Sequence, residues 1–268
     1  MAIEQPGSQL PLRVVMFGSG PILTPDAKRF LCRLEGHPEI KLLGAFCQAE
    51  TQSFSAVVKD LQQRRGLLAW PLLFLWIARS ITPFFTQPRA ELELRRSLAQ
   101  MADKIHFVPH IHASEVLDKV RSLAPDLGLI YGSPILKPKL FEIPTLGTLG
   151  IHHGKVPEYR GNKTMFWAMY NGEQSAGITI QKVNARLDTG QIVKEGEVPI
   201  GRRSQWAVWR DLEALGLDLY IQAILEVKAG TAQYRPQTGP EGKLYRNPEP
   251  TDILRFWIKQ FKRHLGST

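Results

Sequence analysis

The chain has 268 residues, of which 43% are hydrophobic and 22% charged, so it can bury one large core or two modest ones. This composition argues against a disordered chain. The excess of 34 Lys and Arg over 25 Asp and Glu gives a net charge of +9, which favours an anionic partner. This partner could be a phosphorylated substrate, a nucleic acid or an acidic lipid headgroup.

The amino terminus and the cysteines indicate a reducing, cytoplasmic setting. Residues 1–6 lack the basic and then apolar pattern of a signal peptide. Cys32 and Cys47 lie in a predicted helix and a predicted strand without the spacing of metal ligands, so we expect two core thiols and predict no metal site.

Short apolar runs alternate with longer periodic segments, which is typical of an α/β domain with a mostly parallel sheet. Strands are predicted at residues 12–17, 41–46, 105–108, 126–131 and 148–152. Helices are predicted at residues 25–34, with Thr24 as the cap, and at 90–101, 113–123, 204–228 and 251–265. The last two helices form a helical extension, which we place at residues 201–268.

Gly18-Ser19-Gly20 follows the first predicted strand, where glycines can let backbone amides approach a phosphate. The third glycine of a dinucleotide-binding motif is missing, Pro21 follows, and no acidic residue ends the second strand. We therefore interpret this segment as a tight turn between strand and helix.

A histidine and a carboxylate carry the strongest chemical signal. His152 ends a predicted strand and precedes a loop that closes with Pro157-Glu-Tyr-Arg-Gly161, and Asp188 lies in a later loop between Leu187 and Gly190. An imidazole and a carboxylate that face one cleft can act in general acid-base chemistry.

The ordered set of motifs around these two residues resembles the formyltransferase family, whose members move a formyl group from a folate carrier to an amine. The motifs are Pro125-Asp126, Ile135-Leu136-Lys137, His152, Pro157–Gly161, Phe166-Trp167-Ala168, Gly172, Gly177-Ile-Thr179 and Leu187-Asp-Thr-Gly190. The resemblance implies a three-layer, Rossmann-like catalytic domain, which we place at residues 9–200. It also implies that His152 and Asp188 occupy the catalytic positions.

The chain departs from the family at Gly150, where the resemblance leads us to expect an Asn two residues before the His. Losing one oxyanion donor costs about 2.7–4 kcal/mol of transition-state stabilisation unless another group replaces it. A water, the imidazole of His153, or the amide of Asn162 or Asn184 could serve, and the sequence does not choose among them.

The resemblance also implies a donor site for 10-formyltetrahydrofolate. Its residues would be Gly132, Ser133, Pro134, Ile135, Leu136, Arg186 and Leu187. Apolar Ile135 and Leu136 suit a flat heterocycle, although ordinary strand-to-helix packing explains them equally well. Arg160 is interpreted as a residue that holds its loop in place.

We expect the acceptor to be the amine of a small molecule: a sugar nucleotide, an amino acid or a lipid-linked amine. The residues after 200 are too few for the second domain of tRNA-formylating relatives, so tRNA is not the expected acceptor. Two alternatives stay open. One is hydrolysis of the formyl donor, and the other is a binding protein that Gly150 has left without efficient catalysis.

Two apolar segments raise the question of partners. Residues 66–85 are nearly all apolar, but Pro71, Arg79 and Pro83 make them a poor membrane span. The predicted helix 251–265 has an apolar side and a basic side. We expect this helix to dock on the core or on a second copy of the chain in a homo-oligomer, and peripheral membrane contact is the alternative.

Overall fold

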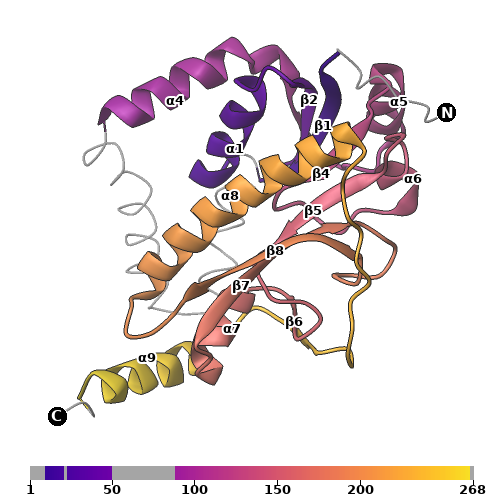
Figure 1. Cartoon of the computed structure of the whole chain (residues 1–268). Helices are drawn as coiled ribbons and strands as arrows, with labels where there is room; N and C mark the ends of the chain where they lie inside the picture. Colours follow the sequence, from indigo (N-terminus) through magenta and orange to yellow (C-terminus); the bar gives the residue numbers. More distant parts are fainter. Residues whose placement is uncertain (1–9, 21–22, 50–87, 266–268) are drawn as a thin grey trace.

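The computed structural model describes residues 10–20, 23–49 and 88–265, and within them seven strands form a single sheet. The strands are β1 (Leu12–Ser19), β2 (Ile40–Gln48), β3 (Ile105–Val108), β4 (Leu127–Ile130), β5 (Thr148–His152), β7 (Ser175–Lys182) and β8 (Gln191–Pro199). Their order across the sheet is β3-β2-β1-β4-β5-β7-β8 (Figure 1).

The sheet has a parallel part and an antiparallel part. Strands β1 to β5 pair in parallel, whereas β7 is antiparallel to both β5 and β8. The mostly parallel α/β sheet predicted from the sequence is therefore confirmed. No strand is predicted from the sequence for the β7–β8 hairpin, whose residues stand out there only as motif positions.

Helices and a small second sheet complete the described structure. The helices are α1 (Pro25–Glu35), α4 (Pro88–Gln100), η2 (Ala102–Lys104), α5 (Ser114–Leu123), α6 (Pro138–Phe141), α7 (Thr164–Asn171), α8 (Gln205–Ala229) and α9 (Pro250–Leu265). Two short strands, β6 (Tyr159–Gly161) and β9 (Lys243–Tyr245), pair in parallel with each other.

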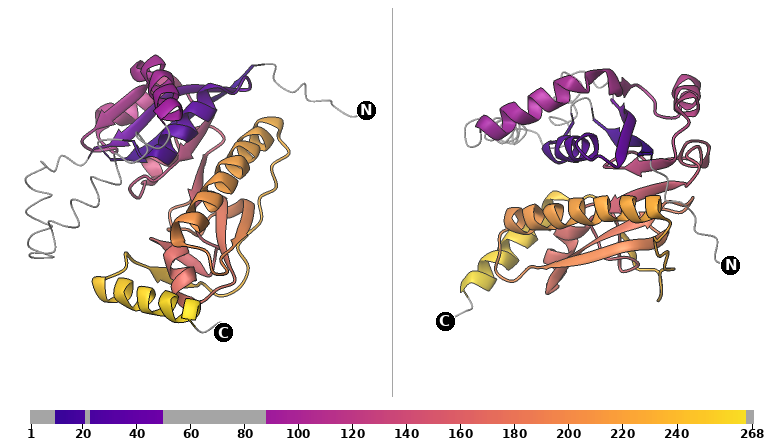
Figure 2. Two further views of the ribbon diagram at one scale, coloured as in Figure 1. Left: turned by 90° about the vertical axis from the view of Figure 1, so that its left-hand side faces the viewer. Right: turned by 45° about the horizontal axis from the view of Figure 1, so that its top comes forward.

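Helices cover both faces of the parallel part, which explains why its strands are apolar along their length. Val14 and Met16 of β1 belong to a cluster with residues of α1 and α8. Val15 and Phe17, which point the other way, belong to a cluster with residues of α5 and α6. All four side chains are buried. Figure 2 shows α8 running along the sheet.

The ends of the helices follow from their capping residues. The Thr24 hydroxyl accepts a hydrogen bond from the backbone N–H of Ala27 at 3.2 Å, as predicted, and Ser204 caps α8 in the same way. Cys47 is buried and Cys32 half-buried, and both are free thiols. The apolar segment 66–85 lies outside the described residues.

Helix α8 begins just after the predicted boundary at residue 200, yet it packs on the sheet. Its Tyr220 is fully buried, and the hydroxyl donates to the carbonyl oxygen of Leu149 at 2.8 Å. Division of the chain at residue 200 stays a prediction. In the described parts of the chain, no helix is long and apolar enough to cross a membrane.

Candidate active site

Strand β5 ends at His152, whose ring is held from two sides. Nε2 lies 2.7 Å from the carbonyl oxygen of Tyr159, and Nδ1 lies 3.5 Å from Oδ1 of Asp188. A carbonyl oxygen only accepts hydrogen bonds, so Nε2 must carry the hydrogen. The neutral ring therefore has its unprotonated nitrogen, Nδ1, beside the carboxylate.

Gly154 makes this geometry feasible, because a Cβ at that position would lie 2.5 Å from Nε2 of His152 and 2.6 Å from the carbonyl oxygen of Tyr159. Any larger residue would force the ring and the carbonyl apart. The observed position of the His152 ring therefore requires glycine at position 154.

The loop between β7 and β8 carries Asp188 back to the end of β5. Oδ2 accepts a hydrogen bond from the backbone N–H of Gly161 at 2.8 Å, and Oδ1 accepts one from Nε2 of Gln181 at 3.3 Å. Asp188 has a φ of 53°, in the left-handed region that aspartate tolerates better than most residues. Both carboxylate oxygens are therefore oriented by the protein.

Burial lowers the pKa of His152, and the charge of Asp188 opposes this shift without reversing it. The residue is only 8% exposed. The ring is therefore neutral near pH 7 and can accept a proton, while the adjacent carboxylate favours the charged ring once it has formed.

Gly150 lies directly opposite Gln181 in the β5–β7 pairing, on the same face of the sheet as His152. The buried Gln181 carboxamide bonds Asp188, and its Oε1 accepts from the backbone N–H of Gly190 at 3.1 Å. A Cβ at position 150 would lie 3.3 Å from Cγ2 of Val183, so an asparagine there would require Val183 to shift. Gln181 is the site residue that sequence reasoning missed, because only the strand register brings it opposite Gly150.

Two of the proposed replacements for the missing asparagine, His153 and Asn184, make other contacts. His153 Nε2 bonds Oε2 of Glu213 at 2.6 Å, and its ring stacks on Trp209. The Asn184 side chain donates to the carbonyl oxygen of Thr189 and accepts from the backbone N–H of Arg186, as expected of a turn residue. Asn162 pairs through its backbone N–H with the carbonyl oxygen of Tyr245.

A segment that follows α8, residues 235–245, braces both loops of the site; we call it the strap. Gln237 donates to the carbonyl oxygens of Asp188 at 3.0 Å and Gly190 at 2.9 Å. Glu241 forms ion pairs with Arg160, at 2.8 Å, and with Arg186. The strap therefore joins the loop that carries Arg160 to the loop that carries Asp188.

Arg160 is buried and also donates to the carbonyl oxygen of Leu187, with Nη2 at 2.8 Å. These contacts hold the two loops together, in keeping with the structural role favoured from the sequence. Arg186 and Leu187 lie on the Asp188 loop, and Leu187 is 40% exposed.

The other predicted donor-site residues follow β4. Gly132 adopts a φ of 61°, and its carbonyl oxygen accepts a hydrogen bond from the Ser19 hydroxyl, so the Gly18–Gly20 turn supports this loop. Ile135 is 70% exposed, whereas Leu136 is buried in a cluster against which Val183 packs. The Ser133 hydroxyl donates to the carbonyl oxygen of Pro134.

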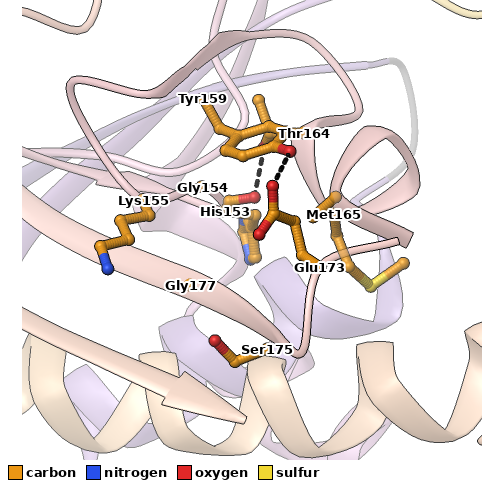
Figure 3. A pocket seen from close by; sticks show the side chains of 10 residues that line it. His153, Gly154, Lys155, Tyr159, Thr164, Met165, Glu173, Ser175 and Gly177 are labelled. Atoms are coloured by element: carbon orange, nitrogen blue, oxygen red, sulfur yellow. Dashed lines mark hydrogen bonds between the residues drawn. The ribbon is translucent and has the colours of Figure 1, made fainter. Parts of the chain in front are cut away.

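A small cavity of about 60 Å³ lies beside the turn after β5. Neither His152 nor Asp188 is among the residues that line it, which include His153, Lys155, Tyr159, Glu173 and Ser175. Figure 3 shows the Tyr159 hydroxyl bonded to Glu173 across its rim. At this size the cavity holds one or two waters rather than a substrate.

Residues 89–224, just over half of the chain, match the formyl transferase family. The chain is 36% identical over 124 residues to a methionyl-tRNA formyltransferase from Alkaliphilus metalliredigens, covering 45% of this chain and 39% of the relative. It is 26% identical over 253 residues to the methionyl-tRNA formyltransferase of Synechocystis sp., covering 92% of this chain and 65% of the relative. The chain thus spans less than two thirds of the length of these relatives.

Among solved structures, a sugar N-formyltransferase from Shewanella sp. has a TM-score of 0.58 and 12% sequence identity, covering 91% of this chain and 86% of that chain. At this identity the likeness concerns the fold, which is the three-layer arrangement described above. With a family match over half of its length and this fold, the chain belongs to the formyl transferase family.

Proposed function

We propose that the protein transfers a formyl group from 10-formyltetrahydrofolate to the amine of a small acceptor. The observation that carries the proposal is the buried His152 ring, whose tautomer is fixed by the Tyr159 carbonyl and whose Nδ1 faces Asp188. Membership of the formyl transferase family supplies the reaction class.

In the proposed reaction, the acceptor nitrogen forms a bond to the formyl carbon and loses a proton to Nδ1 of His152. The new imidazolium is stabilised by Asp188, whose second oxygen is held by the Gly161 N–H. When the bond between the formyl carbon and the folate nitrogen breaks, the proton returns to that nitrogen. The products are the N-formylated acceptor and tetrahydrofolate.

The developing oxyanion needs a hydrogen-bond donor, and we propose Gln181 for this role. Its Nε2 carries two hydrogens and uses one for Asp188, so one N–H remains beside the position where the family's asparagine is replaced by Gly150. A donor on the neighbouring strand would let the site function without an asparagine at position 150.

We propose that the folate donor binds between the loop that follows β4 and the Asp188 loop. The exposed side chains of Ile135 and Leu187 are available to a flat heterocycle, and the Gly132–Leu136 backbone offers polar groups beside them. The bound donor supplies an activated formyl carbon. Leu136, which is buried, would support the loop rather than contact the ring.

The acceptor is proposed to be a small amine because a solved structure with this fold is a sugar N-formyltransferase. Aminoacyl-tRNA is the competing acceptor, since the curated relatives are methionyl-tRNA formyltransferases and the chain carries a net charge of +9. Hydrolysis of the formyl donor would use the same His152–Asp188 pair with water in place of the amine.

The test incubates the purified chain with 10-formyltetrahydrofolate and, in separate arms, amino sugars, sugar nucleotides, amino acids, methionyl-tRNA or no acceptor. Tetrahydrofolate release and the formylated product are both followed. His152→Ala should abolish turnover, and replacing the exposed His110 by alanine provides the matched control. Release without any acceptor would establish a hydrolase, and folate binding without release in any arm would contradict the proposed transfer.

A further inference from the structure

Helix α9 lies at one end of the molecule, beside α7 and away from β1 to β3 (Figures 1 and 2). One side of it is anchored. Phe256 is only 2% exposed and packs on Phe166 with ring centroids 4.9 Å apart, and the half-buried Ile253 joins the same cluster. Docking on the core, expected from the sequence, therefore accounts for this side of the helix.

A second apolar side of α9 is not covered by the described residues. Leu254, Trp257, Ile258 and Phe261 are 62%, 61%, 47% and 66% exposed. At 3.6 residues per turn these four side chains span an arc of about 100°, next to the anchored side. Four large apolar side chains on one arc are more than the scattered single exposures usual on a protein surface.

Positive charge borders this arc. Arg255 and Lys259 are exposed and lie around the helix between Ile258 and the anchored Phe256, and the helix sequence continues with Lys262 and Arg263. The Lys259 ammonium also donates to the carbonyl oxygen of Tyr170 at 3.0 Å. Asp252, in the first turn, is the only acidic residue of α9. Around the helix, an anchored side, an exposed apolar side and a basic side therefore follow one another.

This order matches what an anionic lipid surface requires. Apolar side chains, especially Trp and Phe, enter the boundary between headgroups and acyl chains, while cations beside them meet the lipid phosphates. A second copy of α9 would fit less well, because pairing two such helices brings basic sides together with only Asp252 to offset them. The net charge of +9 adds to the attraction by an acidic membrane.

We propose that the exposed face of α9, formed by Leu254, Trp257, Ile258 and Phe261, binds the surface of an anionic lipid membrane. The contact is peripheral and does not depend on the proposed formyl transfer. It requires only that α9 lie parallel to the membrane with its anchored side turned toward the protein.

The test is sedimentation of the full chain with vesicles of phosphatidylcholine containing 30% phosphatidylglycerol, compared with phosphatidylcholine alone. We expect binding to the anionic vesicles that weakens as salt is raised. The double variant Trp257→Ala and Phe261→Ala should lower the partition coefficient by about tenfold or more, because two aromatic side chains no longer enter the interface. The variant Arg255→Gln, which removes one exposed charge, should lower it by about fivefold.

A matched control replaces Trp206 and Phe107, which are 56% and 48% exposed on other elements, and should leave binding unchanged. Light scattering of each variant reports its oligomeric state. Absence of binding by the wild type, equal binding to both vesicle types, or unchanged binding of the α9 aromatic variant would overturn the proposal. A change from dimer to monomer in that variant, with vesicle binding retained, would instead assign the face to a second copy.

Discussion

Two neighbouring histidines, His152 and His153, each meet a carboxylate, and the two pairs differ in almost every other respect. His152 and Asp188 stand 3.5 Å apart, and Asp188 comes from a loop. His153 and Glu213 are joined by a 2.6 Å bond, and Glu213 is a buried residue of α8 that also accepts from the Tyr131 hydroxyl. Both nitrogens of His152 have a defined environment, yet Nδ1 has no short bond to give up before it takes a proton. We infer that the first pair serves chemistry and the second serves the fold.

The largest expected effect separates the two histidines by activity. His152→Ala removes the proposed proton acceptor and should lower kcat by about 10²–10⁴-fold, the usual contribution of general base catalysis. His153→Ala should change kcat far less, because its ring points toward α8. Steady-state rates of formyl transfer measure both, and circular dichroism checks that each variant is folded. Equal losses of kcat in the two variants would contradict the assignment of the His152 pair to catalysis and of the His153 pair to the fold.

The next prediction concerns the amide that supports Asp188. If Gln181 donates to the oxyanion, Gln181→Leu should lower kcat by about 10²–10³-fold with little change in the fold. Adding Gly150→Asn together with Val183→Ala, which relieves the 3.3 Å approach at position 150, should recover part of that loss.

The matched control for Gln181 is Gln233→Leu, which alters an exposed glutamine of the segment after α8. The rates are measured at saturating donor and acceptor, so that weaker binding is not mistaken for slower chemistry. If the Gln181 variant keeps full kcat and only KM changes, the donor must be another group.

The His153–Glu213 pair should affect the free energy of unfolding rather than the rate of formyl transfer. Glu213→Ala leaves the buried Tyr131 hydroxyl and the half-buried His153 ring without their common partner, and an unsatisfied buried polar group costs about 1–3 kcal/mol of unfolding free energy. Burial acts to raise the pKa of Glu213, but bonds from His153 and Tyr131 hold it below its usual value, so the carboxylate is charged in the folded state.

Urea denaturation measures this cost, with Glu226→Ala on the same helix as the control. Glu226 pairs with Lys194 nearer the surface, so its loss should cost at most about 1 kcal/mol. Glu213→Gln, which keeps the shape and one acceptor, should fall between the two. A Glu213→Ala protein as stable as the control would remove the reason for treating this pair as structural.

The sequence predicted His152 and Asp188 because both lie within local motifs with fixed neighbours. It could not predict Gln181 or Glu241, since their roles depend on pairing across strands and on the strap, which returns from residue 235 onward to the two loops. The parallel strands, like His152 and Asp188, could be predicted because their apolar runs are visible in the local sequence. The β7–β8 hairpin is only partly apolar on its outer strand, so its pattern is weaker, and the burial of α8 becomes evident only when it packs on that hairpin.

The finest distinction between the two pairs lies in the pH dependence of activity. Burial places the pKa of His152 below its ordinary value of about 6.5, and the reaction needs the neutral ring, so kcat/KM should fall only as the pH drops below about 6.5. The charge of Asp188 acts to raise this pKa. Asp188→Asn, in which asparagine also tolerates the left-handed backbone, should therefore lower the pKa of His152 further and move the acid limb to lower pH. The control Asp118→Asn changes an exposed carboxylate on α5 and should leave the limb in place. An acid limb that moves upward in the Asp188 variant would mean that the titrating group is not His152.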